Sequence, residues 1–405
     1  MTKCFGPWAT PASAGSKAHL SAFWKRRLAM LPATHRSSTR LGGRAVLFLL
    51  IAAASVWALP TLRIAIEQGS AQAADASVGS GRISRARMVE VKSTNVWCLA
   101  FSPDSETMAG GTWDGRLILW DADCSNGEER AVLSTKQGRI TAIAFHPDEE
   151  SVLLAGKEVE RWNARTRQRT KTVSLEGGER FDIRAFSPDC AKAVGTQYRT
   201  LRVWDAETGR VTRDFFLMGI GLGAALSPDG RLVAVGTSVD MGDKEGKKSG
   251  VQVWDLASGH LKHVILVPTG SISGAAFSHD GKVIAGGTHR EVLLWDAENG
   301  KLKQRFEGFS GPIEAIAFSP DDQWLAAGGQ GPHLRQPHQT LLLSEMKVWK
   351  LKTGELVQSN VGELGRNTSI VFSPNGRYLA RCDYKSVMMH NFARPETSWA
   401  KRYGQ

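Results

Sequence analysis

The residues best suited to chemistry are few and scattered along this chain of 405 residues. The segment GIGLGA at 219–224 fits GxGxxA, a glycine pattern that binds a dinucleotide phosphate when a strand precedes it and a helix follows. Here a strand-like run leading to SPDG follows, which favours a structural role. The sequence contains no P-loop, HExxH or GxSxG segment. We therefore expect no catalytic residues and no bound nucleotide.

A metal site is a second hypothesis, because histidines and aspartates gather in and near two segments, 238–250 and 330–343. The candidate ligands are Asp240, Asp243, His289, His333 and His338. Imidazole and carboxylate groups bind transition metals, but sequence spacing alone does not bring these residues to one point. We therefore expect no metal and no other cofactor.

The cysteines do not form a recognisable site either. None of the five has CxxC spacing, and no CxxCH haem segment occurs. Scattered thiols do not indicate a disulfide framework. A bridge between Cys98 and Cys382 is one alternative, but we expect single buried thiols. The five are Cys4, Cys98, Cys124, Cys190 and Cys382.

A repeated segment determines how any such residues are positioned. The motif AFSPD, or a close variant of it, occurs seven times, at steps of 44, 41, 40, 51, 41 and 54 residues. Its aromatic or leucine position is Phe101, Phe145, Phe186, Leu226, Phe277, Phe318 and Phe372. A second apolar run follows each motif and ends in Trp at 120, 162, 204, 254, 295 and 349, whereas the seventh run ends in His390.

Each unit reads as short strands separated by turns such as Ser-Pro-Asp-Gly and Asn-Gly, with a more polar outer strand. A repeat period near 40 residues is typical of propellers, in which four-stranded blades stack around a channel. The chain resembles the WD-repeat β-propeller family, in its bacterial FSPDG style, over residues 87–391. The resemblance implies an all-β, seven-bladed disc that binds other macromolecules and is not an enzyme.

The chain also departs from the family pattern. The usual Gly-His dipeptide is missing, with Phe309 in place of the histidine in one unit, and only the first unit keeps the turn aspartate, Asp114. The family's buried hydrogen-bond network therefore cannot form here, and apolar packing should stabilise the blades. The segment RMVEVK at 87–92 alternates with period two, and we expect it to close the ring as the outer strand of blade seven.

The partner-binding residues should lie on one face. The position four before each repeated Phe or Leu opens the first strand of its blade and is mostly polar: Trp97, Thr141, Asp182, Leu222, Ser273, Glu314 and Thr368. We expect these side chains near the top mouth of the channel, together with Trp113 and His289. The alternative is that Trp97 and Trp113 pack between blades.

Two long insertions, 238–250 and 330–343, lie between the second and third strands of units four and six. In the family this connection lies on the top face, so the insertions should flank blade five on one rim. Loops on a scaffold often carry binding residues. We therefore add Asp240, Asp243, His333 and His338 to Trp97, Trp113, Asp182, His289 and Glu314 as partner-binding candidates. The alternative is that both insertions are solvated decorations.

The N-terminal region indicates a membrane segment. Residues 1–44 carry eight basic and no acidic side chains, and residues 45–59 are apolar except Ser55. We divide the chain into a basic tail (1–44), a signal anchor or signal-peptide core (45–66), a linker (67–86) and the propeller (87–405). Basic residues stay on the cytoplasmic side, which predicts export of the propeller to the periplasm. Cleavage near Ala73 would instead give a secreted form, and Met30 is an alternative start.

The net charge of +11 does not indicate nucleic-acid binding, because 43 basic residues face 40 acidic ones after residue 44. The sequence predicts a membrane-tethered or exported interaction module that binds a protein or peptide on its top face. The alternative is an exported propeller that acts as an enzyme or binds a cofactor or metal.

Overall fold

The computed structural model describes residues 87–90, 95–123, 128–238, 249–267, 271–336, 339–383 and 386–392. All of these residues lie in one compact unit, Ser80–Gln405. This unit is all-β in its described part, apart from one 3-10 turn at Gly178–Arg180. The expected membrane segment 45–66, the cleavage region near Ala73 and Cys4 lie outside the described residues.

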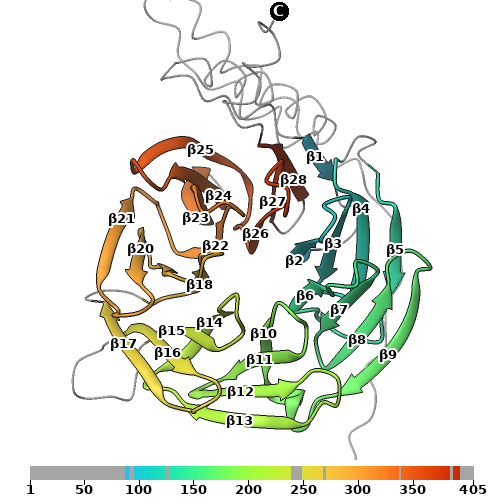
Figure 1. Ribbon diagram of the computed structural model, residues 1–405. Helices are drawn as coiled ribbons and strands as arrows, with labels where there is room; N and C mark the ends of the chain where they lie inside the picture. Colours follow the sequence, from blue (N-terminus) through green and yellow to red (C-terminus); the bar gives the residue numbers. More distant parts are fainter. Residues whose placement is uncertain are drawn as a thin grey trace, which may run out of the picture. The chain divides into compact units, whose positions relative to one another are not determined.

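Seven four-stranded antiparallel sheets form a ring of blades, as predicted from the repeats (Figure 1). In blades one to six the first strand is innermost and the last is at the rim. Blades one to three comprise β2 (Val96–Phe101), β3 (Thr107–Thr112), β4 (Arg116–Asp121), β5 (Ala131–Ser134); β6 (Ala142–Phe145), β7 (Ser151–Ala155), β8 (Glu158–Asn163), β9 (Gln168–Ser174); and β10 (Asp182–Phe186), β11 (Lys192–Gln197), β12 (Thr200–Asp205), β13 (Val211–Phe216).

Blades four to six continue the same order around the channel. They comprise β14 (Ile220–Leu226), β15 (Leu232–Ser238), β16 (Ser249–Asp255), β17 (Leu261–Val267); β18 (Gly274–Phe277), β19 (Val283–Gly287), β20 (Glu291–Asp296), β21 (Leu302–Glu307); and β22 (Ile313–Phe318), β23 (Trp324–Gln336), β24 (Gln339–Lys350), β25 (Glu355–Leu364).

Blade seven joins the two ends of the described chain. Its inner strands are β26 (Ser369–Phe372), β27 (Tyr378–Cys382) and β28 (Ser386–Asn391), and its outer strand is β1 (Arg87–Glu90). β1 pairs antiparallel with β28, with Val89 opposite Val387. The predicted closure is therefore confirmed, and it leaves no open seam in the ring.

The hydrophobic core lies between successive blades, because a single four-stranded sheet cannot bury both of its faces. Seven apolar clusters each join one blade to the next, and the cluster between blades seven and one includes Trp120 and Met389. Phe309, which replaces the histidine of the family's Gly-His dipeptide, packs on Trp349 with 5.8 Å between ring centroids. This position therefore makes an aromatic contact.

The expected loss of the family's buried hydrogen-bond network agrees with the environment of Trp120. Asp114 accepts a hydrogen bond from the Thr112 hydroxyl at 2.6 Å, but the Trp120 Nε1 group has no partner. Trp120 is nonetheless fully buried. Trp120 therefore stabilises the fold through burial of its apolar surface, which contributes about 2–3 kcal/mol for a large side chain.

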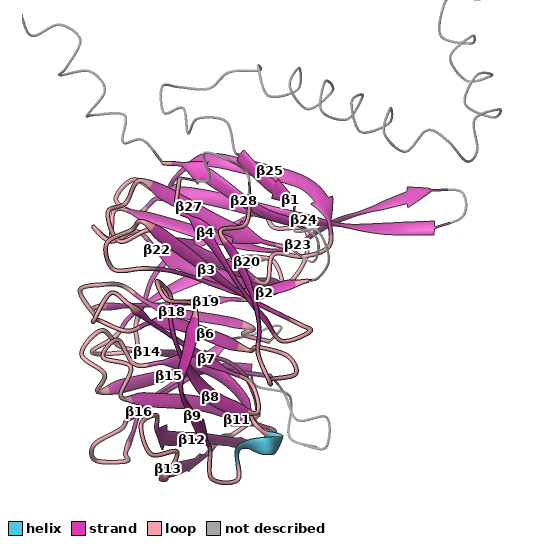
Figure 2. Ribbon diagram, turned by 90° about the vertical axis from the view of Figure 1, so that its right-hand side faces the viewer, coloured by secondary structure: helices cyan, strands magenta, loops and turns pink. Residues whose placement is uncertain are grey.

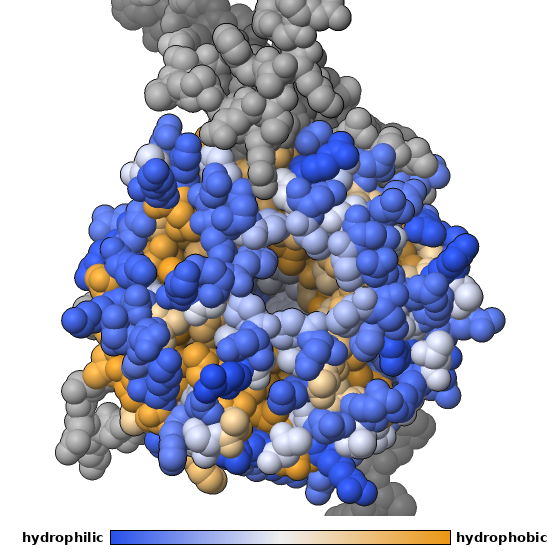
Figure 3. All heavy atoms as spheres, viewed as in Figure 1, coloured by the Kyte–Doolittle hydropathy of each residue, from blue (hydrophilic) through white to orange (hydrophobic). Residues whose placement is uncertain are grey.

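The two insertions take different forms. Residues 239–248, between β15 and β16, lie outside the described residues. Residues 330–343 instead lengthen β23 and β24 into a hairpin that projects from the disc (Figure 2). This hairpin marks the face that carries the connections between second and third strands, called here the top face. Figures 1 and 3 are viewed onto the opposite, bottom face, and Figure 3 shows a hollow at the centre of this face.

Candidate functional site at the channel mouth

Bulges in the inner strands direct side chains into the channel. The register of β2 shifts between Val96 and Cys98, and that of β22 shifts between Ile313 and Ala315. A bulge places two residues opposite one and re-aims a side chain. The residues inside these two shifts are Trp97 and Glu314, and both line the channel.

The channel contains a hollow of about 560 Å³ lined by the inner strands of the blades. Six of the seven positions predicted to open the first strands line it: Trp97, Thr141, Leu222, Ser273, Glu314 and Thr368. The seventh, Asp182, is not part of the lining, because the register shift in β10 falls at Arg184 instead. Asp182 accepts a hydrogen bond from Arg184 at 3.3 Å, so it still contacts the lining.

Two tryptophans and two arginines stack at the mouth. Trp97 and Trp113 meet edge to face, with ring centroids 5.2 Å apart. The Arg139 guanidinium lies 4.7 Å from the Trp113 ring and 5.6 Å from the Trp97 ring, and the Arg366 guanidinium lies 5.9 Å from Trp97. Such cation–π contacts stabilise both partners. Trp113 remains 49% exposed and belongs to no core cluster, which argues against packing between blades.

Carboxylates complete the row at both ends. Asp182 forms an ion pair with Arg139, and Glu314 forms one with Arg366 at 2.9 Å. Burial raises the pKa of Glu314 more than the ion pair lowers it, and burial also lowers the pKa of the Arg184 guanidinium. We call this row the top-face arc; it consists of Asp182, Arg139, Trp113, Trp97, Arg366 and Glu314.

The arginines of the arc were missed in the sequence. Arg139 and Arg366 each stand six residues before the repeated Phe of their units, at Phe145 and Phe372. Both belong to connections that lead into an inner strand on the top face. Because arginine recurs at this position in two units, the sequence could have indicated both residues as candidates. Their contacts with the tryptophans of blade one could not be inferred from the sequence.

The remaining predicted residues lie elsewhere. His289 lines a neighbouring hollow over blade five, and His333 is exposed on the projecting hairpin. Asp240, Asp243 and His338 lie outside the described residues. Within the described ranges, no group of three or more His, Cys, Asp or Glu side chains could hold a metal ion.

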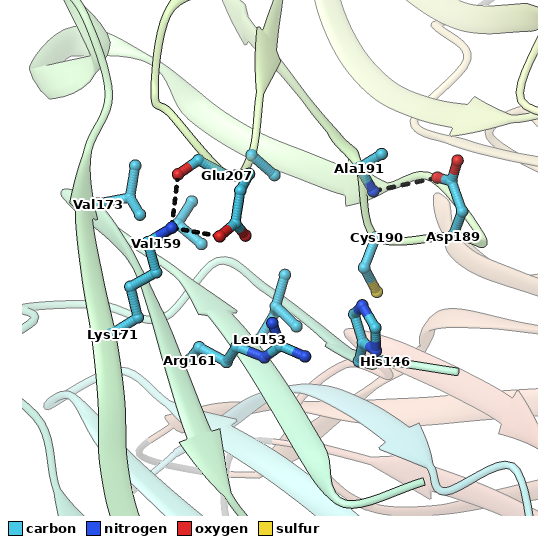
Figure 4. A pocket seen from close by; sticks show the side chains of 11 residues that line it. His146, Leu153, Val159, Arg161, Lys171, Val173, Asp189, Cys190, Ala191 and Glu207 are labelled. Atoms are coloured by element: carbon cyan, nitrogen blue, oxygen red, sulfur yellow. Dashed lines mark hydrogen bonds and ion pairs between the residues drawn. The ribbon is translucent and has the colours of Figure 1, made fainter. Parts of the chain in front are cut away.

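A pocket of about 180 Å³ on the bottom face brings a cysteine and a histidine together (Figure 4). Cys190 points toward the ring of His146, which lies 3.2 Å from the Asp148 carboxylate. The arrangement resembles a thiol nucleophile with its base. However, burial raises the pKa of the Cys190 thiol to about 12, and its Sγ donates to the Phe145 carbonyl oxygen. A neutral, bonded thiol does not favour nucleophilic chemistry.

The other described cysteines, Cys98 and Cys382, are free thiols, and the alternative of a bridge between them is wrong. Of the helices in the described part of the chain, none is long and apolar enough to cross a membrane.

The fold and the site together define a seven-bladed β-propeller with a polar and aromatic surface at its channel mouth. Residues 87–121, 258–296 and 300–335 match the family model of the WD domain, G-beta repeat. The first match begins at the closing strand β1 and runs through β4. The chain therefore carries WD40 repeats on a seven-bladed propeller.

Three curated relatives share parts of this sequence. Protein tipD of Dictyostelium discoideum is 23% identical over 125 residues, which cover 30% of this chain and 20% of the relative. WD repeat-containing protein SL1-17 of Schistosoma mansoni is 27% identical over 158 residues, which cover 38% of this chain and 48% of the relative. Human apoptotic protease-activating factor 1 is 31% identical over 102 residues, which cover 23% of this chain and 8% of the relative. The matches span less than half of each relative.

Proposed function

We propose that this protein is an interaction module that binds a protein or peptide partner on the top face of its propeller. WD-repeat propellers are typical protein-interaction scaffolds. The observation that supports this most directly is the top-face arc, in which a half-exposed Trp113 is held in place by Arg139 and Trp97. Tryptophan and arginine are the residues most enriched at binding hot spots.

The arc is suited to binding because it is organised before a partner arrives. Each arginine of the arc is bonded to a carboxylate and contacts an indole ring. These contacts restrict side chains that would otherwise lose rotamer freedom on binding. The proposed role is binding and not catalysis.

Site-specific photocrosslinking tests the proposal. A photoreactive benzoyl-phenylalanine at Trp113 should crosslink a defined partner in membranes or cell extracts of the source organism. The same group at His260, in an exposed turn on the bottom face, is the matched control. Equal crosslinking at both positions, or none at position 113, would contradict a partner site on the top face.

We further propose that the propeller is exported on a membrane anchor formed by residues 45–66. The support is the apolar run behind eight basic residues. Protease added to intact spheroplasts should digest the propeller, whereas an untethered cytoplasmic control protein should stay intact. Protection of the propeller would refute export. Release into the medium would indicate cleavage near Ala73.

A further inference from the structure

Two hollows on the top face adjoin each other. The channel hollow and the larger one over blade five, of about 1120 Å³, share Leu222 and Ser273 in their linings. The second hollow extends outward to Arg305 and Glu307 on β21, the rim strand of blade five. Together they form a groove that runs from the channel mouth to the rim, called here the radial groove.

The dimensions of the radial groove suit an extended peptide. Crossing blade five from its inner to its outer strand covers three strand spacings, or about 14 Å. An extended chain rises about 3.3 Å per residue, so about four residues would cross the blade. Gly223 and Gly274 line the channel hollow beside Ser273, which both hollows share. A Cβ at Gly223 would approach the Ser273 carbonyl oxygen to 2.4 Å, so the chain segments of blades four and five pass close to each other there.

The charges along the groove are unequal. Among the described residues that line the channel, the charged ones are Arg184, Arg366 and Glu314, two cations and one anion. Including the adjacent pair of Arg139 and Asp182, three guanidinium groups face two carboxylates. Over blade five the lining carries as many carboxylates as guanidinium groups. Arg305 lies 3.7 Å from Glu291, and the lining also contains one further arginine, Arg290, and one further glutamate, Glu307.

Arg184 is the cation best placed for a ligand at the inner end. Its Nε donates to the Thr196 hydroxyl at 2.9 Å, and one terminal nitrogen donates to Asp182. The guanidinium is thereby fixed at the channel wall, and it has five N–H donors in total. A carboxylate can accept two parallel hydrogen bonds from such a group, the strongest polar contact that arginine makes.

We propose that the radial groove binds an extended acidic peptide, with one carboxylate of the peptide bonded to Arg184 in the channel and the following residues lying across blade five. This inference rests on the proposed function and specifies the partner's chemistry. Pro312, which directly precedes the inner strand β22 of blade six, adds partly exposed apolar surface to the lining of the hollow over blade five. Affinity should therefore need one acidic residue at the inner end and tolerate neutral residues after it.

A displayed library of random 12-residue peptides, selected on the full-length protein in detergent, tests this directly. Selected peptides should share an Asp or Glu at one position. Replacing that residue by Asn or Gln in a labelled peptide should weaken binding at least tenfold by fluorescence anisotropy. This change leaves the protein untouched, so misfolding cannot explain the result. Selection of basic or uncharged peptides, or of none, would overturn the inference.

Protein variants then locate the contact. Arg184→Gln should weaken binding of the selected acidic peptide at least tenfold. Arg231→Gln, the same change on the bottom face, should leave the peptide's affinity within twofold of the wild-type value. Glu314→Gln removes the single carboxylate of the channel lining and should strengthen binding. Unchanged affinity in Arg184→Gln, or weaker binding in Glu314→Gln, would contradict the assignment.

The outcomes separate the two proposals. A partner that crosslinks at position 113 while no acidic peptide is selected would refute only the acidic-peptide inference. Selected peptides whose affinity does not depend on Trp113 or Arg184 would refute the radial groove as the binding site. Loss of both crosslinking and peptide selection would refute both proposals.

Discussion

Acid sensitivity should be concentrated at His390, which stands in β28 where the other six units have tryptophan. The side chain is 1% exposed, and its Nε2 atom has no hydrogen-bond partner. Burial, with a smaller effect from the nearby Arg381 charge, lowers the pKa of His390 from 6.5 to about 3. The folded protein therefore holds this ring neutral at pH values where the unfolded chain binds a proton.

The sign and size of the effect follow from that shift. Because the folded pKa is depressed, the stability from the neutral ring is complete above pH 6.5 and is lost as the pH falls toward 3. One pKa unit corresponds to about 1.4 kcal/mol. Lowering the pH from 7 to 5 should therefore reduce the free energy of unfolding by about 2 kcal/mol through this residue alone.

His390→Phe removes the titrating group and keeps an aromatic ring of similar size. Urea denaturation followed by tryptophan fluorescence, at pH 7 and at pH 5, should show that the variant loses about 2 kcal/mol less than the wild type. His260→Phe, in an exposed turn, should retain the wild-type loss. Parallel losses in wild type and His390→Phe would refute the reasoning.

Two further predictions concern the ring itself. Replacing Arg87–Glu90 by Gly-Ser-Gly-Ser lowers the strand propensity of β1, which pairs with β28 to close blade seven, so the melting temperature should fall by several degrees; an unchanged value would show that closure contributes no stability. Phe309→Ala should cost about 3 kcal/mol in urea denaturation, because the ring is 4% exposed and packs on Trp349; a loss below about 1 kcal/mol would contradict that packing role.

Much of the fold could be predicted from the sequence because the repeat is local. The spacing of each Phe and Trp fixed the number of blades, and the alternation in 87–92 identified the closing strand. The hairpin at 330–343 was not predicted as strands, because its residues read as an insertion. Most of its residues gain strand structure by pairing across the hairpin, as His333 does with Leu342.

The site could be predicted only in part. The inner-strand positions of Trp97 and Glu314 followed from their place in the repeat, but Arg184 lines the channel because of a register shift that no sequence pattern marks. The contact of Arg366 with Trp97 joins residues from opposite ends of the propeller sequence. Such contacts depend on ring closure, so they could not be inferred from any single unit.

The central claim, that the top-face arc binds the partner, is tested most directly by the affinity of the crosslinked partner for Trp113→Ala. The account predicts that binding weakens more than tenfold, or about 1.4 kcal/mol. The melting temperature should stay nearly unchanged, because the side chain is 49% exposed. Phe216→Ala, at an 80% exposed aromatic on the rim of blade three, should bind normally. Normal affinity in Trp113→Ala would contradict the claim.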